Sequence, residues 1–290
     1  MNGHRSPPCG WVDGAASLRA LYSVGMALSQ LSRAQYRAAR KLTTRKGRDE
    51  TGEFLVEGAQ AVREALRRPD IVRAVLVEDP DRHAELLAMA DPGRCWQVHA
   101  SDLAGLSDAV TPQGIVAVCL RETTGLDDVP DPRLVVICAQ IRDPGNAGTV
   151  IRCADAFGAD AVVFTKGSVD IHNGKTVRAS VGSLFHLPVV VGVELADAVA
   201  WARSRGCAVL AAAGGGDRLD DLAASGGLRG AVAWVMGNEA WGLPEADRAL
   251  ADRVVGIPMW GRAESLNLST AAAICLYTTA AEQHAGRSHD

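Results

Sequence analysis

From Leu134 onward, short and almost continuous apolar runs alternate with longer segments of helical periodicity. Strands of this kind are buried on both faces, and a helix between successive strands makes them parallel members of one sheet. The strand candidates are Leu134–Ile141, Ala161–Thr165, Leu187–Val191, Ala208–Ala212, Ala231–Met236 and Val254–Ile257. The pattern therefore predicts an α/β fold with a parallel sheet that is covered by helices.

The chain before Leu134 follows a different pattern and predicts a second, smaller α/β unit. We expect strands in Gly52–Gly58, Ile71–Glu78 and Ile115–Leu120, with helices over Ala59–Arg67 and His83–Ala90. At 290 residues the chain is long enough for two ordinary domains. Two domains are thus the simplest organisation.

The domain boundary is expected in Gly125–Arg133, where two prolines and several aspartates form a composition typical of a linker. We therefore assign residues 26–124 to a first domain, 125–133 to the linker and 134–290 to a second domain. The first 25 residues contain Pro7, Pro8, Gly10 and Gly14, which predicts a loosely structured extension.

Composition excludes several classes of protein. An apolar fraction of 48% and a charged fraction of 22% are typical of a soluble globular protein. There is no apolar run that could span a bilayer and no secretory signal in Met1–Gln30, so a cytoplasmic protein is expected. The seven cysteines are scattered without metal-ligand spacing, which predicts buried thiols and no metal site.

Positive charge is concentrated in one segment, although the formal net charge of the chain is −4. Seven cations and no acidic residue occur between positions 33 and 48: Arg33, Arg37, Arg40, Lys41, Arg45, Lys46 and Arg48. Such a run is either the solvated face of a helix or a contact surface for nucleic-acid phosphates. Charge alone leaves both interpretations open.

Three segments of the second domain place polar residues where ligands bind. Asn146–Arg152 follows a turn after the first strand; here Asn146 can cap the next helix, and Arg152 lies in an apolar stretch where a charge needs a partner. Gly237–Pro244 follows a strand, and glycine at its start permits close backbone approach. Ile257–Ser269 carries Ser-x-Asn-x-Ser between a buried strand and an apolar helix.

Together, these segments resemble the signature motifs of the SpoU/TrmH family of RNA ribose 2'-O-methyltransferases, within the SPOUT superfamily. The resemblance extends from about Leu134 to Ala281. It implies S-adenosylmethionine as cofactor, a deep trefoil knot at the C-terminal end of the parallel-sheet domain, and a homodimer formed through the final helix, Leu268–Gln283. A glycine-rich loop, Ala211–Gly216, is expected to close the cofactor pocket.

The family's site residues are transferred to the matching positions. The resemblance implies a catalytic set of Asn146, Arg152, Glu239, Ser265 and Asn267, and a cofactor-binding set of Ala212, Gly237, Ile257, Met259 and Leu266. We interpret Arg152 as a group that holds RNA phosphate and stabilises a developing alkoxide, because arginine almost never loses its proton. For Glu239, proton transfer and the acceptance of loop N–H bonds both stay open. The structural alternatives are Ser265 as a turn residue and Ser269 as a helix cap.

The first domain resembles the family's ribosomal-protein-like substrate-binding module, through the basic run, the Phe54–Gly58 turn and Thr111–Gly114. The RNA-binding residues implied by the basic run are Arg33, Arg40, Lys41, Arg45, Lys46 and Arg48. Such a module favours 23S ribosomal RNA as the substrate, with unpaired loops or bulges as the target. Arg178, in Lys175–Gly182, resembles a second arginine of the methyltransferase family that contacts RNA; the alternative is an ordinary arginine on a helix surface.

Alternatives are transfer RNA as the substrate, or a non-catalytic RNA-binding factor for ribosome assembly. A nucleotide-dependent oxidoreductase is disfavoured because Gly145–Gly148 lacks the G-x-G-x-x-G order. Cys153, Trp241 and Trp260 depart from the family pattern, and we expect them to affect substrate shape rather than cofactor binding.

Overall fold

The computed structural model describes residues 28–285 except 108 and 110. The chain forms two compact units: unit 1 comprises Met1–Glu122 and His172–Phe185, and unit 2 comprises Thr123–Ile171 and His186–Asp290. The predicted N-terminal extension, residues 1–25, lies outside the described residues. The division between Glu122 and Thr123 falls beside the predicted linker.

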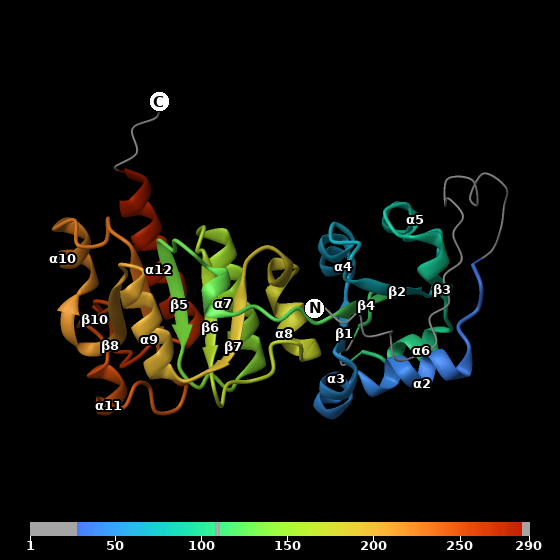
Figure 1. The fold of residues 1–290 in the computed structure, drawn as a ribbon, viewed down its shortest axis with the longest axis horizontal. Helices are drawn as coiled ribbons and strands as arrows, with labels where there is room; N and C mark the ends of the chain where they lie inside the picture. Colours follow the sequence, from blue (N-terminus) through green and yellow to red (C-terminus); the bar gives the residue numbers. More distant parts are fainter. Residues whose placement is uncertain (1–27, 108, 110, 286–290) are drawn as a thin grey trace, which may run out of the picture. The chain divides into compact units, whose positions relative to one another are not determined.

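Unit 1 is built around a sheet with strand order β1-β4-β2-β3, in which β4 is antiparallel to both β1 and β2, and β3 is parallel to β2. The strands are β1 (Glu53–Glu57), β2 (Val72–Val77), β3 (Cys95–Gln97) and β4 (Ile115–Leu120). Helices α4 (Ala59–Leu66) and α5 (Ala84–Leu87) pack on one face, and α2 (Arg33–Lys41) and α6 (Ala100–Ala104) on the other (Figure 1). The other elements between residues 28 and 122 are α3 (Arg45–Thr51) and the 3-10 helix η1 (Pro92–Arg94).

The predicted elements of the first domain are present, with shifts at their ends. β4 has the predicted bounds, whereas α5 is shorter than the helix expected over His83–Ala90. The sequence analysis does not predict β3 and α6, because runs of three and five residues are too short to show a periodicity.

One segment of unit 1 comes from the second half of the chain. It contains α8 (Gly174–Ser180) and η3 (Ser183–Phe185), which the sequence analysis places in the second domain. Val177 of α8 joins the core that contains Phe54, and the Phe54 ring lies 4.5 Å from the His172 ring and 6.3 Å from the Phe185 ring. The segment packs in unit 1 because its apolar side chains bury this part of β1.

Unit 2 contains a six-stranded parallel sheet with the order β10-β8-β9-β5-β6-β7. Its strands are β5 (Leu134–Cys138), β6 (Ala161–Thr165), β7 (Val189–Val193), β8 (Ala208–Arg218), β9 (Val232–Met236) and β10 (Arg253–Gly256). One face carries α9 (Leu195–Ser204), and the other carries α7 (Pro144–Ala156) and α12 (Leu268–Ala285) (Figure 1). The shorter helices are η2 (Leu126–Asp128), α10 (Leu219–Ala224) and α11 (Glu245–Arg248).

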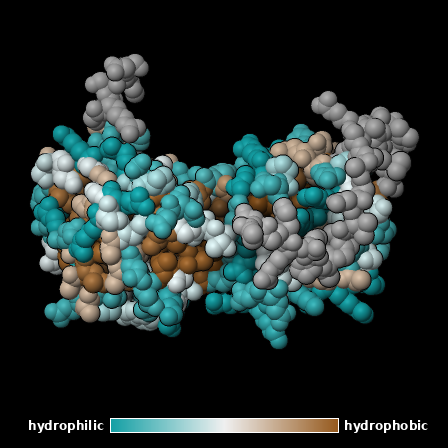
Figure 2. Space-filling view, viewed as in Figure 1, coloured by the Kyte–Doolittle hydropathy of each residue, from teal (hydrophilic) through white to brown (hydrophobic). Residues whose placement is uncertain are grey.

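The parallel sheet confirms the fold class predicted for the second domain, and all six predicted strands are present. The main difference is β8, which continues to Arg218 rather than ending at Ala212. Its register against β10 jumps from Ala211 to Asp217, so the glycine-rich segment bulges out of the sheet. β7 is an edge strand where Val191 is 45% exposed, and Figure 2 shows hydrophobic surface in this region.

Two findings concern membranes and thiols. Among the described residues between 28 and 285, no helix is long and apolar enough to cross a membrane.

Of the described cysteines, Cys95, Cys119, Cys138, Cys207 and Cys275 are buried, as predicted, and Cys153 is half-buried. Burial raises the pKa of Cys95 to about 12 and that of Cys207 to about 11, which keeps these thiols protonated.

A buried hydrogen bond ties α12 to the sheet. The Trp234 indole N–H on β9 donates to Thr279 Oγ1 at 2.9 Å, and both residues are fully buried. Thr279→Val keeps the side-chain shape but leaves this N–H without its acceptor. We expect the free energy of unfolding in urea to fall by about 1–3 kcal/mol. The neighbouring half-buried Thr278→Val should change it by less than about 0.5 kcal/mol. Equal losses in the two variants would contradict this role.

Candidate active site

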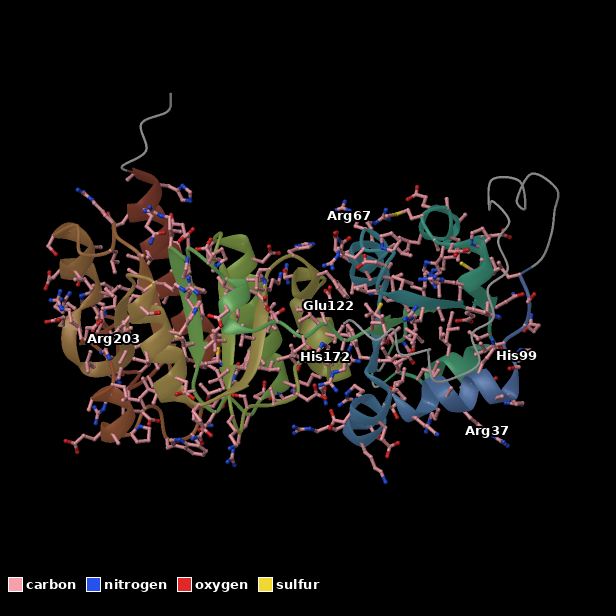
Figure 3. All side chains as sticks on the ribbon, in the orientation of Figure 1. Arg37, Arg67, His99, Glu122, His172 and Arg203 are labelled. Carbon is pink, nitrogen blue, oxygen red and sulfur yellow. The ribbon has the colours of Figure 1, made fainter. Side chains whose placement is uncertain are left out.

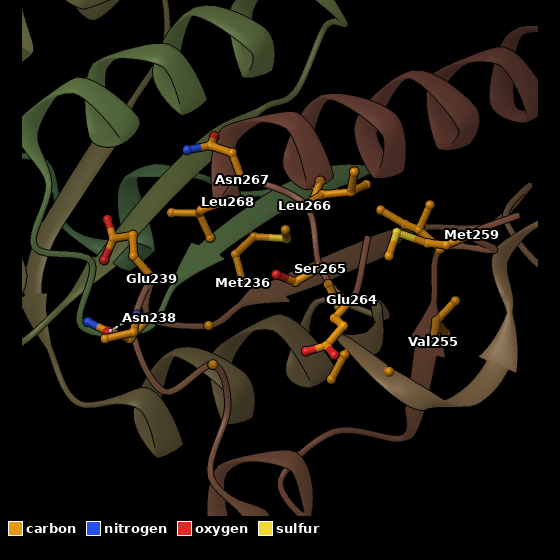
Figure 4. Close-up of a pocket in the computed structure, with 18 residues that line it drawn as sticks. Met236, Asn238, Glu239, Val255, Met259, Glu264, Ser265, Leu266, Asn267 and Leu268 are labelled. Atoms are coloured by element: carbon orange, nitrogen blue, oxygen red, sulfur yellow. Dashed lines mark hydrogen bonds between the residues drawn. The ribbon is translucent and has the colours of Figure 1, made fainter. Parts of the chain in front are cut away.

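A pocket of about 430 Å³ lies in unit 2 at the carboxyl ends of β9 and β10 (Figure 4). Parallel sheets commonly bind ligands at this edge, and the volume falls in the range of about 300–1,000 Å³ typical of small-molecule sites. Three chain segments line it: the bulge of β8, the loop after β9, and the segment between β10 and α12. The pocket is therefore built from parts of the chain that are far apart in sequence.

All five residues predicted to bind a cofactor line this pocket: Ala212, Gly237, Ile257, Met259 and Leu266. Figure 4 shows that the pocket has two different ends. Met259 and Val255 lie at an apolar end, whereas Glu239 and Asn267 lie at the opposite, polar end. Such a cavity suits an amphipathic ligand, with apolar walls on one side and hydrogen-bonding groups on the other.

Glu239 connects the loop after β9 to the turn before α7. Its Oε2 accepts the backbone N–H of Arg142 at 3.2 Å, and its Oε1 accepts the backbone N–H of Asp143 at 3.1 Å. Oε1 also accepts Asn146 Nδ2 at 3.2 Å. The sequence left two roles open for Glu239, proton transfer and the acceptance of loop N–H bonds. The contacts show that it accepts loop N–H bonds.

Two asparagines extend this network to the third motif. Asn267 Nδ2 donates to Asn146 Oδ1 at 3.0 Å, while Asn267 Oδ1 accepts the backbone N–H of Ser269 at 2.9 Å and its hydroxyl at 2.6 Å. Asn146 is thus a donor to Glu239 and an acceptor from Asn267. Side chains from all three motifs form one continuous hydrogen-bonded network, which we call the Glu239 network.

The structure excludes two structural alternatives, in which Asn146 and Ser269 serve as helix caps. Asp143, not Asn146, caps α7, because its side chain accepts the Asn146 N–H at 2.8 Å. Asn267, not Ser269, accepts the first free N–H groups of α12, those of Ser269 and Thr270. The reassignment leaves the Asn146 amide free of a capping duty, so both of its polar ends serve the Glu239 network.

A second set of bonds, which the sequence analysis missed, supports the loops beneath the network. Gln140 adopts a left-handed backbone conformation (φ 52°), which is strained for a residue other than glycine. Its N–H donates to Thr165 Oγ1 at 2.9 Å, and its carbonyl accepts Asn238 Nδ2 at 2.6 Å. Asn238 is buried and stands beside Glu239. An asparagine directly after the strand-ending glycine was the only sequence signal for this role.

Gly237 is required by the loop itself rather than only by a ligand. A Cβ at this position would lie 2.5 Å from the Gly242 carbonyl carbon and 2.7 Å from the Leu243 nitrogen. Glycine therefore does allow a close backbone approach at this position, as predicted. The atoms that approach Gly237 belong to the main chain of its own loop rather than to a ligand. The Gly237 main chain still lines the pocket.

Ser265 also lines the pocket, and its hydroxyl makes no hydrogen bond with the residues that the structure describes. This leaves the hydroxyl available to a ligand. Its neighbour Glu264 lines the pocket as well and was not predicted, although it stands directly before the polar trio of the third motif.

Arg152 lies on the exposed face of α7. Its guanidinium forms no hydrogen bond or ion pair with any described residue, so the expectation that it needs a protein partner is wrong: the side chain is solvated. Burial raises the pKa of the adjacent Cys153 thiol, and the positive charge of Arg152 acts in the opposite direction. A free, exposed guanidinium is suited to binding an anionic ligand.

The residues predicted to bind RNA separate into two groups. Arg33, Arg40, Lys41, Arg45 and Lys46 are exposed on α2 and α3, and Figure 3 shows Arg37 pointing away from α2. By contrast, Arg48 is only 3% exposed and donates from Nη1 to the Leu42 carbonyl at 2.8 Å. Its inclusion in the RNA-binding set is therefore wrong, because a buried guanidinium cannot reach a phosphate.

Arg178 is held by unit 1. Its Nη1 donates to Glu57 Oε2 at 2.7 Å, and Glu57, which is 7% exposed, also accepts the Ser107 hydroxyl. A buried carboxylate needs such partners to offset its desolvation. Arg178 thus stabilises the fold of unit 1, and the pocket of unit 2 does not include it.

Comparison with known proteins decides the family. The model of the SpoU rRNA methylase family matches residues 133–277, and that of the MRM3-like substrate-binding domain matches residues 34–117. The chain belongs to the SpoU rRNA methylase family. The first match contains all three motifs of the Glu239 network, and the second coincides with the greater part of unit 1.

Relatives match along most of the chain. The 23S rRNA (guanosine(2553)-2'-O)-methyltransferase RlmP of Bacillus subtilis is 37% identical over 82% of this chain and 92% of its own. The 23S rRNA (uridine(2479)-2'-O)-methyltransferase of Streptomyces viridochromogenes is 31% identical over 85% and 89%. The crystal structure of the SpoU methyltransferase AviRb from the same organism, in complex with AdoMet, is 30% identical, covers 88% of this chain and 100% of its own, and has a TM-score of 0.75.

Asn267 allows its helix cap and its network bond to be separated. Asn267→Asp retains an oxygen that caps α12 but replaces the amide donor with an oxygen that faces Asn146. Because Asp and Asn cap helices about equally well, we expect the free energy of unfolding to stay within about 0.5 kcal/mol of wild type. Methyl transfer should nevertheless fall by about 10- to 100-fold because the site is misaligned.

Asn267→Ala is the matched variant, since it removes the cap as well and should cost about 1 kcal/mol of stability. Denaturation and methyl-transfer assays on the same preparations provide the check. If Asn267→Asp kept full activity, the bond to Asn146 would have no catalytic importance.

Proposed function

We propose that this chain transfers a methyl group from S-adenosylmethionine to a ribose 2'-hydroxyl of 23S ribosomal RNA. The observation that carries the proposal is the Glu239 network at the polar end of a cofactor-sized pocket. Relatives over most of the chain, named as 23S rRNA 2'-O-methyltransferases, support the substrate.

The pocket fits the cofactor. Ile257, Met259 and Leu266 offer apolar walls for an adenine ring, and main-chain groups around Gly237 can bind its polar edge. Ser265 and Glu264, which line the pocket between its two ends, offer polar groups to the charged amino-acid part of the molecule. When bound, S-adenosylmethionine supplies a methyl group attached to a positively charged sulfur.

The chain's own residues position the RNA and stabilise charge. The exposure of Arg152 and its lack of a partner among the described residues support a role in binding an RNA phosphate and stabilising the oxyanion that develops on the ribose. In this proposal the hydroxyl proton passes to phosphate or water. Asn146 and Asn267 orient the hydroxyl. Glu239 holds the loops together, because both of its oxygens already accept backbone N–H groups. Most of the rate gain is expected from alignment of the two reactants.

Unit 1 is proposed to bind the RNA through the exposed cations of α2 and α3. The match to a substrate-binding domain supports this role, as does the absence of an acidic residue between Arg33 and Arg48. Phosphate contacts make binding salt-dependent. If Arg40→Ala with Lys41→Ala left the salt dependence of 23S rRNA binding unchanged, these side chains would not contact phosphate.

We further propose that the C-terminal segment is threaded as a deep trefoil knot and that unit 1 has a ribosomal-protein-like fold. The bond between Asn267 and Asn146 and the packing of α12 against α7 support the knot, because they bring the chain after β10 back to the first motif. A crystal structure that traces Ile257–Leu268 outside the other loops would contradict it. The proposed location is the cytoplasm, where ribosomes are modified, and cell fractionation tests it.

Replacement of Arg152 tests the proposed chemistry. Transfer of radiolabelled methyl groups to 23S, 16S and transfer RNAs should label 23S RNA with wild type, and Arg152→Ala should reduce the rate at least about 100-fold. Arg152→Lys should remain strongly impaired, because an ammonium lacks the planar two-donor geometry. Arg205→Ala, which changes another exposed arginine of unit 2, is the control and should retain activity. Near-normal turnover in Arg152→Lys would disprove the proposed role of the guanidinium.

A homodimer is proposed through α12 and α7. Tyr277 on α12 is 62% exposed and packs edge-on against Phe157 at a centroid distance of 5.6 Å, leaving aromatic surface uncovered. Tyr277→Glu places a charge in this surface, so light scattering at micromolar concentration should show a shift from dimer to monomer. Val191→Glu, a matched change at an exposed apolar position of β7, should remain dimeric. A wild-type monomer would refute the proposal.

A further inference from the structure

Trp241 is an exposed aromatic residue on a rigid loop beside the Glu239 network. Its side chain is 47% exposed, although burial of an indole is normally favourable. The loop is closed by two backbone hydrogen bonds of 2.9 Å between Asn238 and Gly242, and Gly242 supplies the left-handed conformation (φ 66°) that the turn requires. The ring is thus presented to solvent on a fixed backbone, two residues after Glu239.

Arg142 covers part of this indole. Its Cζ lies 5.0 Å from the ring centroid, within the range of a cation–π contact. The guanidinium is exposed and pairs with no acidic group among the described residues. The Arg142 backbone N–H, in turn, donates to Glu239. The same residue therefore contacts both the exposed ring and the network at the polar end of the pocket.

We propose that Trp241 and Arg142 form a stacking platform for an unpaired RNA base at the nucleotide that is methylated. The inference rests on the proposed function and specifies how the target nucleotide is held. An exposed indole stacks on any base, and a neighbouring arginine adds attraction for the ring and for the phosphate that accompanies it. Proteins that recognise unpaired RNA commonly stack its bases on aromatic side chains or on arginine guanidinium planes.

Two other occupants are less consistent with the structure. The adenine of the cofactor would need the indole inside the pocket, but Trp241 is not among the residues that line it. A protein partner would be expected to bind a wider apolar surface, whereas the loop neighbours of Trp241 are the small residues Ala240 and Gly242. A single aromatic face beside a cation matches a base better than either.

Steady-state methyl transfer to in vitro transcribed 23S rRNA tests the platform. Trp241→Ala should raise the KM for RNA by about 5- to 150-fold, the range that base stacking provides, and leave the KM for S-adenosylmethionine unchanged. Trp241→Phe should restore most of the RNA affinity because phenylalanine also stacks. Arg142→Met should give an intermediate loss. Val191→Ala is the matched control: this side chain is exposed to a similar extent (45%) but lies on β7, outside the three motifs.

Indole fluorescence gives a second readout that does not depend on turnover. Addition of the RNA should quench wild type more than Trp241→Phe, whereas S-adenosylmethionine alone should affect the two equally. An unchanged RNA KM in Trp241→Ala, or an equal rise in Val191→Ala, would overturn the proposal. A rise in the cofactor KM alone would assign the ring to adenine and would also overturn it.

If a protein, and not RNA, quenched the wild type more than Trp241→Phe, Trp241 would contact a protein partner and the proposal would be wrong. Absence of methyl transfer in the wild type, by contrast, would refute the proposed function itself. The two failures are therefore distinguishable.

Discussion

Glu239 holds together chain segments that are almost one hundred residues apart, and the rest of the site depends on these bonds. A single carboxylate accepts the N–H groups of Arg142 and Asp143 and the amide of Asn146. Because an ionised acceptor makes stronger hydrogen bonds than a neutral one, this contact can fix the turn before α7. Once the turn is fixed, Asn146 is placed to accept the Asn267 amide, and the segment before α12 is aligned against the pocket.

Support for this arrangement comes from the layer beneath. The left-handed backbone of Gln140 is supported by two hydrogen bonds: its main-chain N–H donates to Thr165, and its carbonyl accepts from Asn238. Strained backbone of this kind persists where the surrounding structure determines it. The strand ends of β5, β6 and β9 thus share one hydrogen-bonded framework, so the loops above them have little freedom.

The sequence predicted the parallel sheet well because apolar runs are a local property, whereas the pocket-lining residues were implied by the resemblance of three motifs to a known family. Ala212, Gly237 and Ile257 line a single pocket, as expected. The identity of the helix caps could not be predicted, since Asp143 and Asn146 are both good caps and only the folded turn selects between them. The burial of Arg48 could not be predicted either. A run of basic residues does not show which side chain will be buried and bonded to a main-chain carbonyl.

The contacts of Glu239 also determine which substitutions are tolerated at position 142. Glu239 binds the main chain at position 142, not the Arg142 side chain, which instead lies over Trp241. Any residue other than proline supplies the same N–H group. The framework of the site therefore tolerates variation at position 142, and that position can acquire new side chains while the catalytic geometry is preserved. If Arg142 contacts the target base as proposed, base preference can change at this position while the hydrogen bonds of Glu239 are kept.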